Sequence, residues 1–232
     1  MRVVSYRICP FVQRVTATLA AKGLAHGIDY ISLSDKPGWF LALSPTGQVP
    51  VLVTDGGRAL FESDAIVEYL DEVAPPLTPD LSPEDRAEER AWSTQAAKHY
   101  LVQCGAMQSP DRETLARKHA ALDRAFARVG ARLGDGPFFA GARPGKVDLA
   151  WLVLLHRAAI VERRTGHDLL AGHPKVKAWQ GTLMATGLAE RSVAGDFETA
   201  FAALYLSPRT WLGREAGATA APVAEAGCGS CC

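Results

Sequence analysis

The apolar pattern of this 232-residue chain changes at one proline-rich segment, residues 74–79 (APPLTP), and this change constrains the fold most. Before the segment, short β-prone runs alternate with runs at helical spacing. After it, to about residue 206, apolar residues keep helical spacing only. Proline and a lack of periodicity are typical of a linker. We therefore predict an α/β domain (1–74), a linker (75–82), an all-helical domain (83–208) and a flexible tail (209–232).

The first domain follows the order β-α-β, a long loop, then β-β-α. Its strands are expected at residues 3–6, 28–33, 50–54 and 58–61, the last two joined by a hairpin turn, DGG. One helix carries Val12, Val15 and Leu19 on its apolar face and stops at Gly23, and another begins near Ser63. This order is typical of a thioredoxin-like fold, although other small α/β sheets share it.

The helical domain contains one run, DLAWLVLL (148–155), that is apolar almost all round. Such a run is typical of a central helix buried on every side. Asp148 falls in its first turn, and Gly145 takes the N-cap position.

Composition excludes several classes of protein. Hydrophobic residues make up 48% of the chain and its formal charge is zero, so neither disorder nor electrostatic binding to nucleic acid or a membrane surface is indicated. The first residues lack the apolar core of a signal peptide, and the most apolar run, 147–155, is too short to span a bilayer. Five cysteines in this arrangement do not form a secreted disulfide framework. We therefore expect a soluble, cytoplasmic protein.

Cys9 lies where the first strand meets the first helix, in the stretch RICPFVQR (7–14). Pro10 takes the first helical position, where a missing N–H loses nothing. A thiol there faces unpaired amides and the positive end of the helix dipole, which favour the thiolate. Cysteines so placed titrate at about pH 3.5–7.5 instead of about 8.5. We expect Cys9 to be a nucleophile with a lowered pKa and not a buried structural cysteine.

The motif that begins at Cys9 is C-x-x-V, because position 12 is valine, so it supplies no neighbouring resolving thiol. A disulfide attacked by Cys9 would leave a mixed disulfide that an external thiol must release. Glutathione is the obvious cytosolic thiol. The question is then whether the chain holds a glutathione site.

Three motifs occur in order: CPFVQR (9–14), SPTGQVPVL (44–52) and ESDAIVEYL (62–70). With a helical domain behind them, which carries VDLAW (147–151) and HPKVKAWQ (173–180), they resemble the cytosolic glutathione transferases. A cysteine at position 9 points to the omega-like and dehydroascorbate-reductase-like branches. The resemblance implies a thioredoxin-like N-terminal domain, an all-α C-terminal domain and a homodimer.

The resemblance also implies a glutathione site made of Phe11, Lys36, Val49, Pro50, Glu62 and Ser63. The Val49 backbone, before a Pro50 that is cis in this family, would pair with the cysteinyl part of glutathione. Ser63, at a helix N-terminus, would accept the γ-glutamyl carboxylate while Glu62 meets the ammonium group. Lys36 would pair with the glycine carboxylate.

Two features depart from most of the family. Cysteine replaces the usual tyrosine or serine near the sulfur and tends to form a disulfide with glutathione, and Gly145 replaces the usual serine or threonine of the helical cap.

The acceptor site should lie between the domains. Its candidate residues are Trp92, His99, Tyr100, Trp211 and Cys104, the last expected to be buried and inert.

The chain ends in CGSCC, with Cys228, Cys231 and Cys232 in an alanine- and glycine-rich segment. Three uses compete for these thiols: a mobile redox arm, a site for a soft metal such as Cu(I), Zn or Hg(II), and a double-prenylation signal. An appendage without a role is disfavoured because exposed thiols oxidise readily. Redox and metal binding stay open.

The prediction for the whole chain is a glutathione-dependent thiol transferase or reductase with Cys9 as nucleophile. An alternative enzyme would use the same cysteine to remove a group from a glutathione conjugate or to dehalogenate a small molecule. A third possibility is a non-catalytic module that binds soft metal through its tail.

Overall fold

The computed structural model describes residues 1–219, and its first domain is built on a four-stranded sheet of order β2-β1-β3-β4. The strands β1 and β2 are parallel, and the pairs β1–β3 and β3–β4 are antiparallel. The strands are β1 (Arg2–Ser5), β2 (Gly27–Tyr30), β3 (Val51–Val53) and β4 (Ala59–Phe61).

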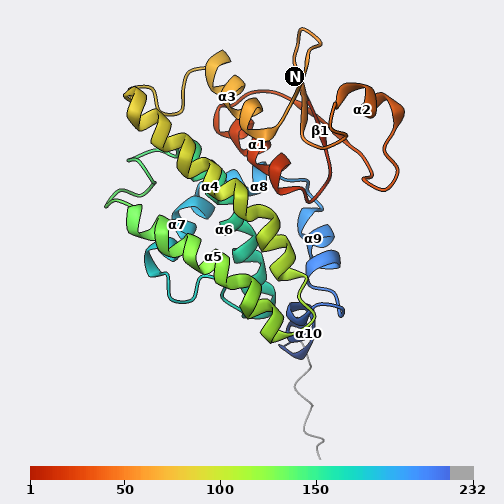
Figure 1. Cartoon of the computed structure of the whole chain (residues 1–232), viewed down its shortest axis with the longest axis vertical. Coiled ribbons are helices and arrows are strands. Elements are labelled where there is room, and N and C mark those ends of the chain that lie inside the picture. Colours follow the sequence, from red (N-terminus) through yellow and green to blue (C-terminus); the bar gives the residue numbers. More distant parts are fainter. Residues whose placement is uncertain (220–232) are drawn as a thin grey trace, which may run out of the picture.

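Helices cover both faces of this sheet (Figure 1). Val3 and Leu52 point to the face covered by α1 (Pro10–Ala21) and α3 (Ser63–Val73). Val4 and Val51 point to the other face, where Phe40 of α2 (Gly38–Leu43) is fully buried. This alternation follows from the period of two in a strand.

The predicted thioredoxin-like fold with a helical second domain is confirmed, with two local differences. The strand β2 ends at Tyr30 and not at 33, and the long loop contains α2. A helix of six residues is shorter than two turns, so its apolar residues show no helical period in the sequence.

The described residues of the second domain form helices joined by loops. Its elements are α4 (Pro83–Met107), α5 (Arg112–Arg132), α6 (Lys146–Thr165), α7 (Pro174–Ala185), α8 (Leu188–Arg191), α9 (Phe197–Tyr205) and α10 (Trp211–Thr219).

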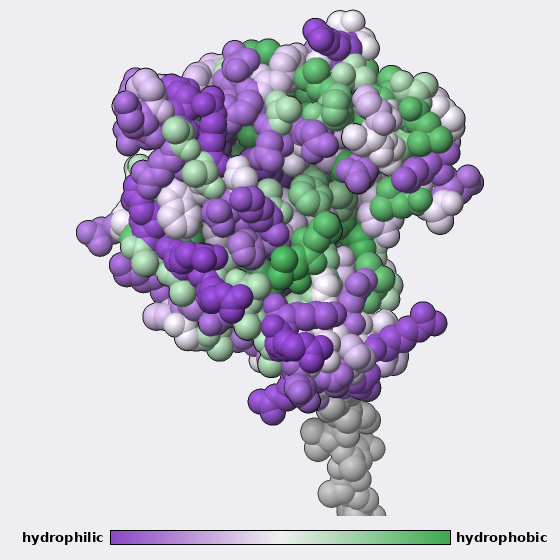
Figure 2. All heavy atoms as spheres, viewed as in Figure 1, coloured by the Kyte–Doolittle hydropathy of each residue, from purple (hydrophilic) through white to green (hydrophobic). Residues whose placement is uncertain are grey.

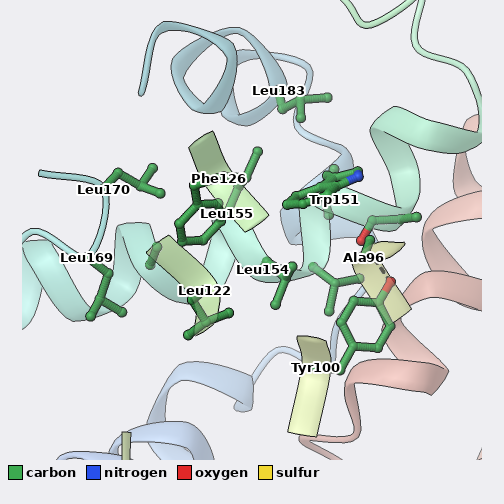
Figure 3. Close-up of a cluster of buried hydrophobic side chains, with 14 of the residues drawn as sticks. Ala96, Tyr100, Leu122, Phe126, Trp151, Leu154, Leu155, Leu169, Leu170 and Leu183 are labelled. Carbon is green, nitrogen blue, oxygen red and sulfur yellow. Dashed lines mark hydrogen bonds between the residues drawn. The ribbon is translucent and has the colours of Figure 1, made fainter. Parts of the chain in front are cut away.

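The helix α6 is the central helix that the sequence predicts, because every residue from 146 to 158 is buried. Phe126 of α5 packs against Trp151 of α6 with ring centroids 6.1 Å apart, and Tyr100 of α4 donates a 2.7 Å hydrogen bond to the Ala150 carbonyl (Figure 3). These contacts fix α4 and α5 against α6.

Asp148 holds the start of α6. Its carboxylate accepts hydrogen bonds from the amides of Gly145 and Phe139, both at 2.9 Å, and from the Trp179 indole at 2.8 Å. A Cβ atom at position 145 would lie 3.0 Å from the Thr78 methyl group. Glycine at the cap therefore lets the linker approach closely.

Buried charges join the two domains. Lys146, at the start of α6, contacts Glu68 at 3.1 Å and Asp71 at 3.3 Å on α3, and Glu89 at 3.1 Å on α4. Lys22 of α1 contacts Asp71 at 2.9 Å. We call these five residues the interdomain ion cluster.

The prediction of a flexible tail from residue 209 is wrong for residues 211–219, which form α10. Leu212 is buried, the Trp211 amide donates to the Ser109 carbonyl at 2.8 Å, and Arg214 donates to the Pro110 carbonyl. The alanine- and glycine-rich composition of this segment shows no lasting apolar pattern at helical spacing, so the sequence did not indicate the helix. Cys228, Cys231 and Cys232 lie outside the described residues.

Between residues 1 and 219 no helix is both long and apolar enough to cross a membrane.

Candidate active site

Cys9 is the N-cap residue of α1, with Pro10 at the first helical position, as the sequence predicts. The turn after β1 is closed by a 2.9 Å hydrogen bond from the Cys9 amide to the Tyr6 carbonyl. The side chain is half-buried and makes no disulfide with any residue between 1 and 219. The thiol therefore sits at the start of a helix and packs against the edge of the core that α1 and α3 share.

The electrostatics of Cys9 differ from the prediction. Burial raises the pKa of its thiol, and this effect outweighs the Val12 and Phe11 amides and the Arg157 guanidinium, which lower it. The groups expected to favour the thiolate are present. The predicted net decrease in pKa is nevertheless wrong for the glutathione-free protein, because desolvation is the largest effect.

A hollow of about 100 Å³ lies beside this turn of α1. Five of the six residues predicted to bind glutathione line it, together with two neighbours from the loop before β3: Phe11, Thr46, Gln48, Val49, Pro50, Glu62 and Ser63. The Val49–Pro50 peptide bond is cis, as the resemblance implies. The structure thus brings three separate stretches of sequence to one hollow.

Glu62 and Ser63 stand where β4 meets α3. Glu62 is the N-cap residue and has a φ of 65°, a backbone conformation that residues other than glycine rarely adopt. Ser63 begins α3 and is buried. The first amides of a helix have no partner within it, so those of α3 can donate hydrogen bonds to a carboxylate.

Lys36 does not line the hollow, but it lies close to it. A Cβ atom on Gly47 would be 3.8 Å from the Lys36 ammonium nitrogen, and Gly47 sits between two lining residues, Thr46 and Gln48. Lys36 forms no ion pair with the rest of residues 1–219 and is half-buried. Its cation is therefore available next to the predicted site.

The candidate acceptor residues do not gather in one place. Tyr100 is buried and its ring meets Phe11 edge-on at 5.2 Å, so it lies on the Cys9 side of α4. Cys104, one turn further along α4, is buried as expected. His99 is half-buried and bonds the Gln95 carbonyl of its own helix at 2.6 Å.

The two tryptophans lie elsewhere. Trp92 packs on Phe139 with ring centroids 5.9 Å apart, and Trp211 meets His167 at 5.1 Å near the far end of α4. Figure 2 shows apolar side chains gathered on the viewed face where the first domain meets α4 and α9.

The sequence analysis missed Arg157, a charged side chain that contacts the residue before Cys9. Arg157 of α6 is fully buried and donates to the Ile8 carbonyl at 3.1 Å and to the Gln13 side chain. The signal for it was a charged residue inside an apolar run, LVLLHRAAIV (152–161).

No group of three or more His, Cys, Asp or Glu side chains in the described part of the chain could hold a metal ion. The predicted metal ligands of the tail lie beyond that part.

Comparison with known proteins agrees with this geometry. Residues 8–73 match the family "Glutathione S-transferase, N-terminal domain", and residues 112–179 match "Glutathione S-transferase, C-terminal domain". The chain is 32% identical over 186 residues to glutathione S-transferase omega-1 of Mus musculus, covering 79% of this chain and 76% of that protein.

Two further similarities involve a plant protein and a fungal structure. The chain is 33% identical over 142 residues to glutathione S-transferase DHAR2 of Arabidopsis thaliana, covering 61% of this chain and 63% of that protein. The crystal structure of glutathione transferase Omega 3C from Trametes versicolor superposes with a TM-score of 0.70 at 24% identity, covering 83% of this chain and 88% of that one. The chain therefore belongs to the glutathione S-transferase family of enzymes, in its omega-like and dehydroascorbate-reductase-like branch.

Proposed function

We propose that this protein is a glutathione-dependent thiol transferase in which Cys9 is the nucleophile. The observation that carries the proposal is the position of Cys9 at the N-terminus of α1, one turn from a hollow lined by Phe11, Val49 and Ser63. Relatives named omega-1 and DHAR2 support glutathione as the co-substrate.

The reaction proceeds in two exchanges. The Cys9 thiolate attacks the glutathione sulfur of a glutathionylated substrate, so the substrate thiolate leaves and Cys9 becomes joined to glutathione. A second glutathione thiolate attacks the glutathione sulfur of that mixed disulfide. Cys9 thiolate leaves, and oxidised glutathione is released. Overall, one disulfide bond is exchanged for another: the substrate is released as its thiol, one free glutathione is consumed, and it leaves joined to the glutathione that the substrate carried.

The residues around the hollow supply binding. The first turn of α3, with Ser63, favours the γ-glutamyl carboxylate, and Glu62 offers its own carboxylate to the ammonium group. Lys36 lies near enough to the loop of Gly47 to meet the glycine carboxylate. Val12 is apolar and buried, so an external thiol completes the cycle.

A mass measurement tests this proposal. After incubation with oxidised glutathione, peptide mapping should find glutathione on Cys9, and reduced glutathione should remove it. Cys9→Ser should lose the modification at that peptide and all thiol transfer, because a serine hydroxyl cannot form the mixed disulfide. Cys104→Ser is the matched control and should keep both. Thiol transfer at the wild-type rate in Cys9→Ser would contradict the mechanism.

The homodimer belongs to the same proposal. Exposed apolar side chains occur on both domains, with Phe61 at 40% and Val73 at 53% on the first and Leu101 at 66% on the second. Contact between the first domain of one subunit and the helical domain of the other would cover exposed apolar side chains of both domains. A cytoplasmic location and a redox or metal-binding role for the tail cysteines stay predictions.

A further inference from the structure

Arg157 is a positively charged side chain placed entirely in the interior. Its exposed fraction is 0%, although it comes from α6 of the helical domain and reaches the first domain. Its Nη2 atom donates to the Ile8 carbonyl at 3.1 Å, and Nη1 donates to the Val153 carbonyl at 3.1 Å and to Gln13 Oε1. The guanidinium thus grips the peptide unit that joins Ile8 to Cys9.

This buried cation lacks a carboxylate. Among residues 1–219, no Asp or Glu oxygen lies within ion-pair distance of Arg157, and its Nε atom has no hydrogen-bond partner. The other deeply buried cations near α1 are paired: Arg14 with Asp64, and Lys22 with Asp71. An ionised group buried without an opposite charge is costly, so the structure leaves the guanidinium short of one anion.

The polar neighbours of Arg157 supply dipoles but no negative charge. Gln13 turns its oxygen to Arg157, while its amide nitrogen meets His156 Nδ1 at 2.9 Å and Ser192 Oγ at 3.2 Å. Burial, with the charges of Arg157 and Arg163, lowers the pKa of His156 to about 3, so this imidazole is neutral. Arginine can only donate hydrogen bonds, so the Gln13 oxygen must face Arg157 and the Gln13 nitrogen must face His156 and Ser192.

Four ionisable groups act electrostatically on the guanidinium, in falling order of effect: Cys104, Tyr205, Cys9 and Tyr100. Burial raises the pKa of Tyr100 and of Tyr205, so both phenols stay neutral near pH 7. Two thiols remain. Of these, Cys104 is buried beside Tyr205, whereas Cys9 is only half-buried and also faces the first amides of α1.

We propose that Arg157 is the buried counter-ion of the Cys9 thiolate, acting as a positioning residue from the opposite domain. The proposal rests on Cys9 as the nucleophile. In the two exchanges above, Cys9 is a thiolate when it attacks and again when it leaves. One fixed cation therefore favours both the attacking and the leaving form, and it also holds the Ile8–Cys9 peptide in place.

Alkylation of Cys9 by iodoacetamide tests this without glutathione or substrate, so its outcome is separate from that of the proposed thiol transfer. The rate at Cys9 is followed by peptide mapping across pH in the full chain. Arg157→Met removes the cation and should move the midpoint of the profile up by about one pH unit, which lowers the rate at pH 7 about tenfold. Arg157→Lys keeps a charge and should stay within a few-fold of wild type. Arg163→Met, which removes an exposed arginine from the same helix, is the matched control and should leave the midpoint unchanged.

A second variant keeps the test decisive if Arg157→Met fails to fold. Gln13→Glu has nearly the same shape and places a carboxylate directly on the guanidinium. It should raise the Cys9 midpoint in the same direction, because the cation is then neutralised without being removed. A wild-type Cys9 profile in either folded variant, or a shift at Cys104 in place of Cys9, would overturn the proposal.

Discussion

At the scale of single residues, Cys9 is subject to two opposed influences. Its surroundings exclude water, which penalises the thiolate, while the amides of Phe11 and Val12 and the Arg157 charge favour it. Position in the sequence revealed the helix amides, but neither the burial nor the Arg157 charge, since both depend on packing across the domains. A motif at a helix N-terminus is therefore a guide to where a nucleophile lies and an incomplete guide to its pKa.

The pH profile of Cys9 follows from this balance. Since burial raises its folded-state pKa, iodoacetamide should alkylate Cys9 in the glutathione-free protein with a midpoint above the value of about 8.5 for a free cysteine. The same chain unfolded in urea provides the reference, because its Cys9 is solvated. A folded midpoint below the unfolded one would show that the amides and Arg157 outweigh burial.

The sequence identified the site residues with uneven success, for physical reasons. Pro50 and Ser63 stand in local motifs, and both line the hollow beside Phe11. Trp92 and Trp211 were chosen by residue type, but a tryptophan packs wherever the interior has room, and both lie among other partners. Arg157 contacts Ile8, a residue 149 positions away, so no local pattern could place it.

At the scale of elements, periodicity predicted the long helices and failed for the short ones. The apolar run of α6 makes its burial evident in the sequence. By contrast, α2 has six residues and α10 has nine, and each is held by contacts from other elements, such as the hydrogen bond from the Trp211 amide to Ser109. Short helices depend on tertiary packing because nucleation is costly.

The interdomain ion cluster gives a stability prediction for α6 and α3. Lys146 is 2% exposed, and replacing it with methionine would leave Glu68, Asp71 and Glu89 without their shared cation. Such a loss costs about 3–5 kcal/mol in unfolding free energy, measured by urea denaturation. Arg90→Met is the control, because Arg90 contacts the same Glu68 from a side chain 53% exposed, and it should cost less than about 1 kcal/mol.

The pH dependence of that cluster has a definite sign. The carboxyl pKa values of Glu68 and Asp71 are lowered. Burial alone would raise them, but it is outweighed by hydrogen bonds from Arg90 and Lys146 to Glu68 and from Lys22 to Asp71. Their contribution to stability is present above the unfolded values of about 4 and is lost as the pH falls through the folded values. Equal losses for Lys146→Met at pH 7 and pH 3 would contradict this assignment.

At the scale of the whole molecule, the proposed homodimer is open to a direct measurement. Each chain has a mass of 24.8 kDa, so light scattering should give about twice that value. The mass should hold on dilution through the micromolar range, because a stable interface would involve both domains. A mass of one chain at every concentration would contradict the dimer.

The contact between residues 8–16 and the helical domain has a consequence for how this protein can have evolved. Thr16 donates a 2.6 Å hydrogen bond to the Ser192 carbonyl, and Gln13 and Ile8 accept hydrogen bonds from Arg157, so the surroundings of Cys9 include residues of the helical domain. The two halves are therefore not interchangeable modules. In a hybrid that joins residues 1–74 to the helical half of a relative, the reactivity of Cys9 would change with the residue that the new half places against Ile8 and Gln13.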